Sequence, residues 1–148
     1  MPSRILFVDD EPKVLQGLQR MLRPFRHQWD MEFVDSGEKA LQVLAESPFD
    51  VIVSDMRMPG MDGVQLLNEV VRRHPRVVRI VLSGHSDEEV IMRSVGPAHQ
   101  YLAKPCDADT LLAAVTRACA LRGVLAADNL QQLVSRIASL PSLPELYT

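Results

Sequence analysis

Short apolar runs alternate along this chain with segments whose apolar residues recur at helical spacing. Each run stops at a polar residue and is too short for an ordinary helix. The five runs cover residues 5–8, 31–34, 51–54, 77–82 and 100–103. Such runs are typical of strands that are buried on both faces. Strands that alternate with helices predict βαβ units and a parallel sheet covered by helices on both faces.

Right-handed crossovers leave few topologies for such a chain. We expect an α/β, doubly wound (βα)5 fold of the flavodoxin type, with a five-stranded parallel sheet in the order 2-1-3-4-5. Residues that favour helix starts or turns support five intervening helices. They are Pro12, Ser36, the loop 57–63, the capping-box pair Ser86 and Glu89, and Asp107.

The last part of the chain differs in character from the rest. Residues 1–122 suffice for one domain, and Gly123 is expected to interrupt the last helix. Apolar residues then recur at three-four-three spacing between Leu130 and Leu140, which predicts a helical extension over 123–148. That helix could form a homodimer seam, or it could pack on its own domain. The proline-punctuated segment 140–147 is expected to lead into a further domain.

Composition narrows the function classes. The 148 residues carry a formal net charge of −3, and Arg136 is the one cation beyond Gly123, so no DNA-binding output is expected in this chain. No apolar run approaches the ~20 residues of a membrane span, and no signal-peptide pattern is present. The two cysteines form no CxxC pair and are expected to be reduced. We therefore expect a cytoplasmic protein.

Three carboxylates follow two strands that should be neighbours in the sheet. Asp9 and Asp10 come after the first strand, and Asp55 comes after the third. Ligands of open parallel sheets bind at the carboxyl ends of the strands, where the strand order switches. Clustered carboxylates repel one another, and a hard dication relieves that cost. Mg2+ fits because it prefers oxygen ligands and commonly bridges to phosphate.

The fourth and fifth strands supply two further groups at the same edge. Ser83 offers a hydroxyl that can hold a phosphate oxygen, and Lys104 offers a mobile cation. A carboxylate nucleophile, a metal site and charge-stabilising groups together favour phosphoryl transfer to a carboxylate.

In these features the chain resembles the receiver domains of two-component response regulators over residues 3–122. The resemblance is carried by the acid pair Asp9-Asp10, Asp55, the segment 58–63, Ser83, and Lys104-Pro105. It implies that Asp55 is the phosphoacceptor, with phosphoryl groups coming from a histidine kinase or phosphotransfer protein. It also implies a signalling domain that assists only its own phosphorylation and dephosphorylation, and is not otherwise an enzyme.

The resemblance assigns the remaining roles residue by residue. Asp10, Asp9, Asp55 and the backbone carbonyl of Arg57 would hold Mg2+. Ser83 and Lys104 would bind phosphoryl oxygens, and the Lys104-Pro105 bond would be cis. Tyr101 would turn inward on phosphorylation and remodel the face made by the fourth helix, fifth strand and fifth helix. A half-buried strand tyrosine without a switching role is the alternative for Tyr101.

Two residues are expected to tune the lifetime of the phosphoryl group. Arg57 lies two residues after Asp55, and His85 lies two residues after Ser83. Both should flank the route by which water reaches an aspartyl phosphate. The alternative is that Arg57 simply points to solvent.

The output and the competing functions follow from other segments. Residues 140–144 and 96–101 resemble HDOD proteins, which carry a helical module related to HD-type phosphohydrolases and have a receiver attached. The alternative is a stand-alone receiver or phosphorelay shuttle that acts by binding a protein. An aspartyl-phosphate phosphohydrolase is disfavoured because Arg57 occupies the position of its second acid. A nucleotide-binding module is disfavoured because no glycine-rich loop follows the first strand.

Overall fold

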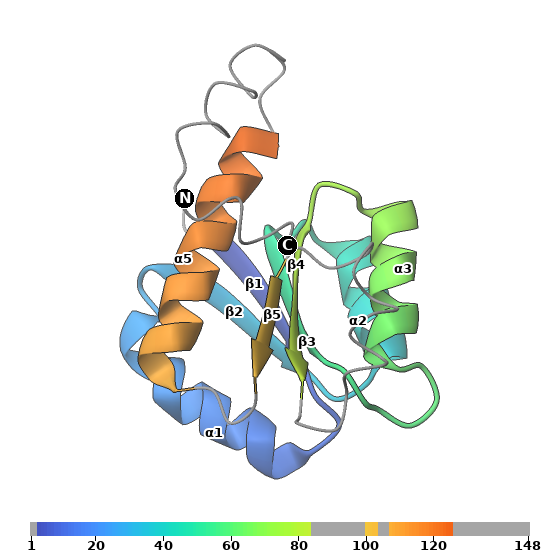
Figure 1. The fold of residues 1–148 in the computed structure, drawn as a ribbon, viewed down its shortest axis with the longest axis horizontal. Coiled ribbons are helices and arrows are strands. Elements are labelled where there is room, and N and C mark those ends of the chain that lie inside the picture. The colour runs from blue at the N-terminus through green and yellow to red at the C-terminus, as the bar shows by residue number, and fades with distance from the viewer. Residues whose placement is uncertain (1–2, 84–99, 104–106, 126–148) are drawn as a thin grey trace.

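The computed structural model describes residues 3–83, 100–103 and 107–125. Within these ranges, five parallel strands form one sheet in the order β2-β1-β3-β4-β5, the predicted order (Figure 1). The strands are β1 (Ser3–Val8), β2 (Trp29–Val34), β3 (Val51–Asp55), β4 (Val78–Ser83) and β5 (Gln100–Ala103). The predicted parallel α/β architecture is therefore confirmed.

Helices cover both faces of the sheet. α1 (Pro12–Leu22) and α5 (Ala108–Leu125) pack on one face, and α2 (Gly37–Glu46) and α3 (Gly63–Arg73) pack on the other (Figure 1). The fourth predicted helix, with its capping pair Ser86 and Glu89, lies outside the described residues. None of the described helices combines the length and apolar character that a membrane crossing requires.

Local signals explain where the helices begin. Pro12 opens α1, where its missing N–H costs nothing. The Ser36 hydroxyl accepts a hydrogen bond from the Lys39 N–H at 3.1 Å and caps α2. The Asp107 carboxylate accepts one from the Thr110 N–H at 2.7 Å ahead of α5. The predicted starts of these three helices are thus confirmed.

α1 ends at Leu22, and a short 3-10 helix that contains Pro24, η1 (Arg23–Phe25), follows directly. One expected boundary was wrong by a few residues. α5 does not stop at Gly123 but continues to Leu125. A glycine inside a helix costs about 1 kcal/mol, which packing of the helix on a sheet can offset. The proposed division at 122/123 stays a prediction, and the leucine repeat beyond it lies outside the described residues.

Alternation along β1 builds the two layers of the core. Ile5 and Phe7 face the α1/α5 layer, whereas Leu6 and Val8 face the α2/α3 layer, and all four are buried. β1 is therefore fixed from both sides. The β1–β3 register pairs Val8 with Ser54, so both strands end at the same level of the sheet. This alignment brings the residues after Val8 next to the end of β3.

Candidate functional site

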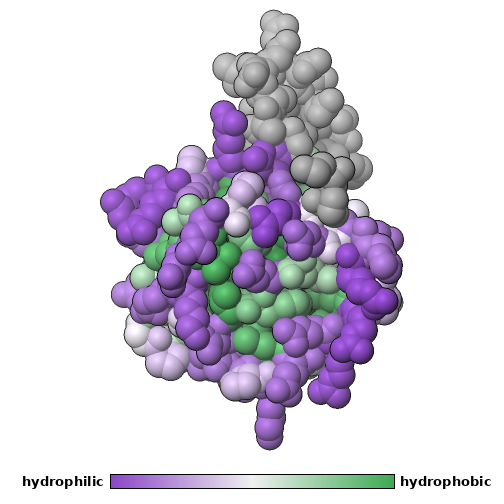
Figure 2. Space-filling view, turned by 180° about the vertical axis from the view of Figure 1, so that it is seen from behind, coloured by the Kyte–Doolittle hydropathy of each residue, from purple (hydrophilic) through white to green (hydrophobic). Residues whose placement is uncertain are grey.

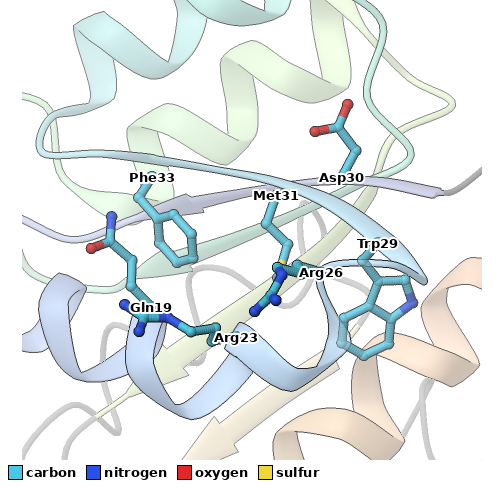
Figure 3. Close-up of a pocket in the computed structure, with 7 residues that line it drawn as sticks. All are labelled: Gln19, Arg23, Arg26, Trp29, Asp30, Met31 and Phe33. Carbon is cyan, nitrogen blue, oxygen red and sulfur yellow. The ribbon is translucent and has the colours of Figure 1, made fainter.

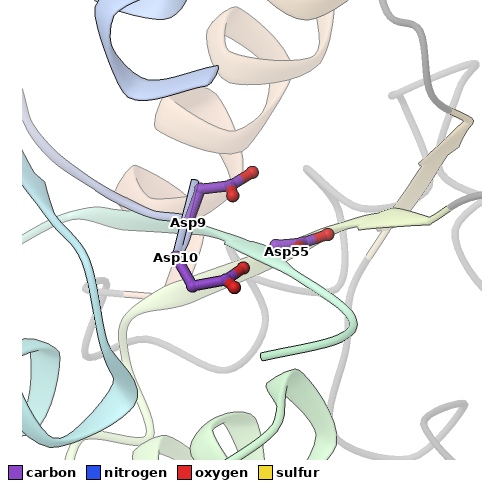
Figure 4. A group of neighbouring side chains, drawn as sticks. All are labelled: Asp9, Asp10 and Asp55. Atoms are coloured by element: carbon purple, nitrogen blue, oxygen red, sulfur yellow. The ribbon is translucent and has the colours of Figure 1, made fainter. Parts of the chain in front are cut away.

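Three carboxylates meet at the carboxyl ends of β1 and β3. One oxygen from each of Asp9, Asp10 and Asp55 lies within 4.8 Å of the others. The three side chains lie next to one another with their carboxylates pointing to the same side (Figure 4). Asp9 is 1% exposed and Asp55 is 7% exposed, while Asp10 is half-buried. The predicted cluster therefore forms, with one member more open to solvent than the others.

The residues on either side of Asp55 hold it in place. The Met56 N–H donates to the Asp55 carboxylate at 2.9 Å and lies 3.1 Å from the Leu82 carbonyl. The Ser54 hydroxyl donates to the Asp55 backbone carbonyl at 2.9 Å. Both contacts are buried. The carboxylate thus has a fixed orientation at the strand end, which favours a reacting group.

Asp9 and Asp10 differ in their contacts. The Asp9 carboxylate accepts a hydrogen bond from the Glu11 N–H at 3.0 Å, and its backbone N–H donates to the Val34 carbonyl at 3.2 Å. Asp9 therefore also shapes the turn into α1. Asp10 has no side-chain hydrogen bond or ion pair within the described part of the chain. Its half-buried carboxylate is the one most available to a ligand.

The loop after β3 folds back tightly onto the site. The Gly63 N–H donates to the Met56 carbonyl at 2.9 Å, and a Cβ added to Gly63 would lie 2.3 Å from the Asp55 carbonyl oxygen. Only glycine fits this approach without displacing backbone. Asp62 caps α3 through a reciprocal capping box with Gln65. Neither feature was predicted from the sequence, although Asp62 and Gln65 have capping-box spacing.

The donor set suits a hard cation. Three carboxylates so close together repel one another, and the repulsion is strong where water is partly excluded. All available ligand atoms are oxygens, which match Mg2+ better than a soft metal. The arrangement can therefore hold a divalent cation beside the fixed Asp55 carboxylate.

The other predicted site residues are placed only in part. Arg57 is exposed and lies two residues beyond the end of β3. Ser83 is the last residue of β4, the neighbour of β3, and Tyr101 lies within β5. Lys104, Pro105 and His85 lie outside the described residues. The structure thus brings together the three carboxylates and places the backbone of Ser83 on the neighbouring strand.

Comparisons with known proteins point to one family. The model of the family described as the response regulator receiver domain matches residues 5–116. The hydrogenase transcriptional regulatory protein HoxA of Cupriavidus necator is 40% identical over 128 residues, which cover 82% of this chain and 25% of that protein. NtrC of Klebsiella pneumoniae is 41% identical over 112 residues, covering 75% of this chain and 24% of NtrC. The chain thus spans about a quarter of the length of these relatives.

Solved structures give the same result. The signal receiver domain of an HD domain-containing protein from Pseudomonas fluorescens Pf-5 has a TM-score of 0.78 and 32% identity, covering 83% of this chain and 98% of that one. A response regulator receiver domain protein from Clostridium thermocellum has a TM-score of 0.76 and 29% identity, with the same coverage. The similarity therefore extends over nearly all of these two domains.

Proposed function

Because this chain belongs to the response regulator receiver domain family, we propose that Asp55 accepts a phosphoryl group from a histidine kinase or phosphotransfer protein. The observation that carries this proposal is the fixed Asp55 carboxylate with oxygens of Asp9 and Asp10 within 4.8 Å. A carboxylate oxygen of Asp55 attacks phosphorus, and the bond from phosphorus to the donor breaks. The product is an acyl phosphate on Asp55, and the electron pair of the broken bond leaves with the donor.

The neighbouring groups have separate tasks in this proposal. Asp9, Asp10, Asp55 and the backbone carbonyl of Arg57 hold Mg2+, which neutralises phosphoryl charge when it is bound. Lys104 and Ser83 bind phosphoryl oxygens, and the peptide bond before Pro105 is cis. The Met56 N–H keeps the nucleophile oriented through its 2.9 Å hydrogen bond. The domain assists only its own phosphorylation and dephosphorylation.

The response to phosphorylation is expected on the face that contains β5 and α5. Ser83 ends β4, which pairs with β5 through the register Ser83 to Ala103 and Val81 to Tyr101. A shift of Ser83 toward the phosphoryl group would therefore displace β5, the strand that pairs with β4. Tyr101 is the residue proposed to switch there.

An attached output domain of the HDOD type is the proposed target of the switch. It is supported by the segment 140–144 and by the similarity to a receiver from an HD domain-containing protein. The curated relatives HoxA and NtrC are transcriptional regulators, so their outputs are of another kind. A stand-alone receiver or phosphorelay shuttle is the alternative. The length and sequence of the complete gene product distinguish these cases.

The central proposal is tested by incubation with Mg2+ and acetyl phosphate, followed by intact-protein mass spectrometry. The wild-type chain should gain one phosphoryl group, and Asp55→Asn should gain none. Asp109→Asn is a matched control, because it removes an exposed aspartate that does not belong to the carboxylate cluster. Equal uptake by the Asp55→Asn variant would refute the assignment.

A further inference from the structure

A groove beside α1 shares no residue with the carboxylate cluster. It is formed between the C-terminal half of α1, η1 and the edge strand β2, and has a volume of about 520 Å³. Figure 3 shows its lining side chains gathered between helix and strand. They are Gln19, Arg23, Arg26, Trp29, Asp30, Met31 and Phe33.

The floor of the groove is apolar and preformed. Trp29, Met31 and Phe33 alternate along β2 and face α1, and Phe33 stacks on Phe7 with ring centroids 4.9 Å apart. Asp30 also borders the groove, but its carboxylate points away from the other lining side chains and is bound by Arg4 at 3.0 Å (Figure 3). The other lining residues include no acid, so no carboxylate of the described residues points into the groove.

The rim of the groove is cationic. Arg23 and Arg26 are both exposed, and neither guanidinium has an ion pair or side-chain hydrogen bond within the described ranges. Guanidinium groups bind carboxylates through two parallel hydrogen bonds. Seen from behind, the molecule shows an apolar area surrounded by hydrophilic side chains (Figure 2). Two unneutralised cations beside apolar surface favour an occupant that carries both carboxylates and apolar side chains.

The backbone of β2 is also available for pairing. Among the strands that the structure describes, β2 is the outermost, and β1 is its one partner. The Val34 carbonyl faces β1, where it accepts from the Asp9 N–H. Because backbone groups alternate sides along a strand, those of Met31 and Phe33 face the open edge. An exposed edge of this kind can accept an added strand.

We propose that this groove binds an extended acidic segment of a partner protein, which adds to the β2 edge. Its backbone pairs with Met31 and Phe33, its apolar side chains cover the floor, and its carboxylates bind Arg23 and Arg26. A second copy of this chain fits poorly. If β2 pairs antiparallel with β2 of a second copy about a two-fold axis perpendicular to the sheet, Asp30 and Glu32 of both copies lie together on one face of the joined sheet.

The test uses the 148-residue chain and a fluorescent synthetic peptide with the repeat Thr-Val-Thr-Asp, which places valine and aspartate on the same face of the added strand, toward the floor and the two arginines. Fluorescence anisotropy should show binding that weakens about tenfold or more in the variant R23E/R26E. Arg76→Glu is the matched control, because Arg76 is an exposed arginine outside the groove. This variant should bind the peptide with wild-type affinity. A peptide with serine in place of aspartate should bind at least about tenfold more weakly.

Amide hydrogen exchange separates strand addition from simple charge attraction. The bound peptide should protect the amides of Met31 and Phe33, whereas those of Asp30 and Glu32 already face β1. Equal binding of the two peptides, or an unchanged affinity in the double variant, overturns the proposal. Binding of the acidic peptide without new protection at Met31 and Phe33 also overturns it. Thermal unfolding of each variant verifies that the fold is retained.

Discussion

Gly63 packs so closely against Asp55 that a Cβ at position 63 would lie 2.3 Å from the Asp55 carbonyl oxygen. The next nearest atom, the Met56 Cα at 2.9 Å, also belongs to the backbone and cannot rotate away. We expect Gly63→Ala to lower the free energy of unfolding by about 1–3 kcal/mol, because backbone must shift to admit the methyl group. Urea unfolding measures this change, and acetyl phosphate uptake should slow because the end of β3 carries Asp55, the proposed phosphoacceptor.

Gly17→Ala provides the matched comparison. Gly17 lies inside α1, and a Cβ built there would meet nothing within 4 Å. We expect this substitution to raise the free energy of unfolding by about 0.5–1 kcal/mol, because alanine has the higher helix propensity. Measured together by urea unfolding, the two variants should change stability in opposite directions. A neutral Gly63→Ala variant would show that the loop after β3 has room to relax.

Asp10→Asn tests the cation site with little damage to the fold, because Asp10 has no side-chain hydrogen bond in the described part of the chain. Without Mg2+, the variant should be more stable than the wild type, since one repulsive charge is lost. A Mg2+ concentration a hundredfold above Kd should stabilise the wild type by about 2.7 kcal/mol. Most of that gain should disappear in Asp10→Asn. Thermal unfolding with and without Mg2+ measures both effects, and an equal Mg2+ gain in both proteins would argue against this site.

Much of the fold and of the acidic cluster could be predicted because both follow from short-range patterns. Asp9, Asp10 and Asp55 immediately follow apolar runs, and the carboxyl ends of neighbouring parallel strands lie at the same edge of the sheet. The approach of Gly63 to Asp55 could not be predicted, since it depends on how the intervening loop folds back. The groove beside Arg23 depends likewise on the angle at which η1 passes β2. Tertiary packing sets both the approach of Gly63 to Asp55 and the shape of the groove, and no local pattern in the sequence encodes it.

Arg57→Asn should change the lifetime of the phosphoryl group more than its uptake. Arg57 is exposed and lies two residues beyond Asp55, whose carboxylate is held independently by the Met56 N–H. A long cation there can obstruct water or bind the phosphoryl group, whereas asparagine is shorter and uncharged. Decay of the phosphorylated protein after removal of acetyl phosphate measures the lifetime. Identical decay rates would mean that the Arg57 side chain has no part in it.

Stability in acid should depend on the cap of α5. The pKa of Asp107 is lowered mainly by the backbone N–H of Thr110, which donates to the carboxylate at 2.7 Å, with a further contribution from the Thr110 side chain. A folded-state pKa below the unfolded one means that the contribution is present above the unfolded pKa and is lost as pH falls through the folded pKa. Wild type should therefore be more stable than Asp107→Asn at pH 7, and the difference should shrink below about pH 4.

Urea unfolding at both pH values tests this, with Asp109→Asn as the control for loss of one charge from the same turn. A difference that stays constant with pH would show that the ionised Asp107 carboxylate does not stabilise the start of α5.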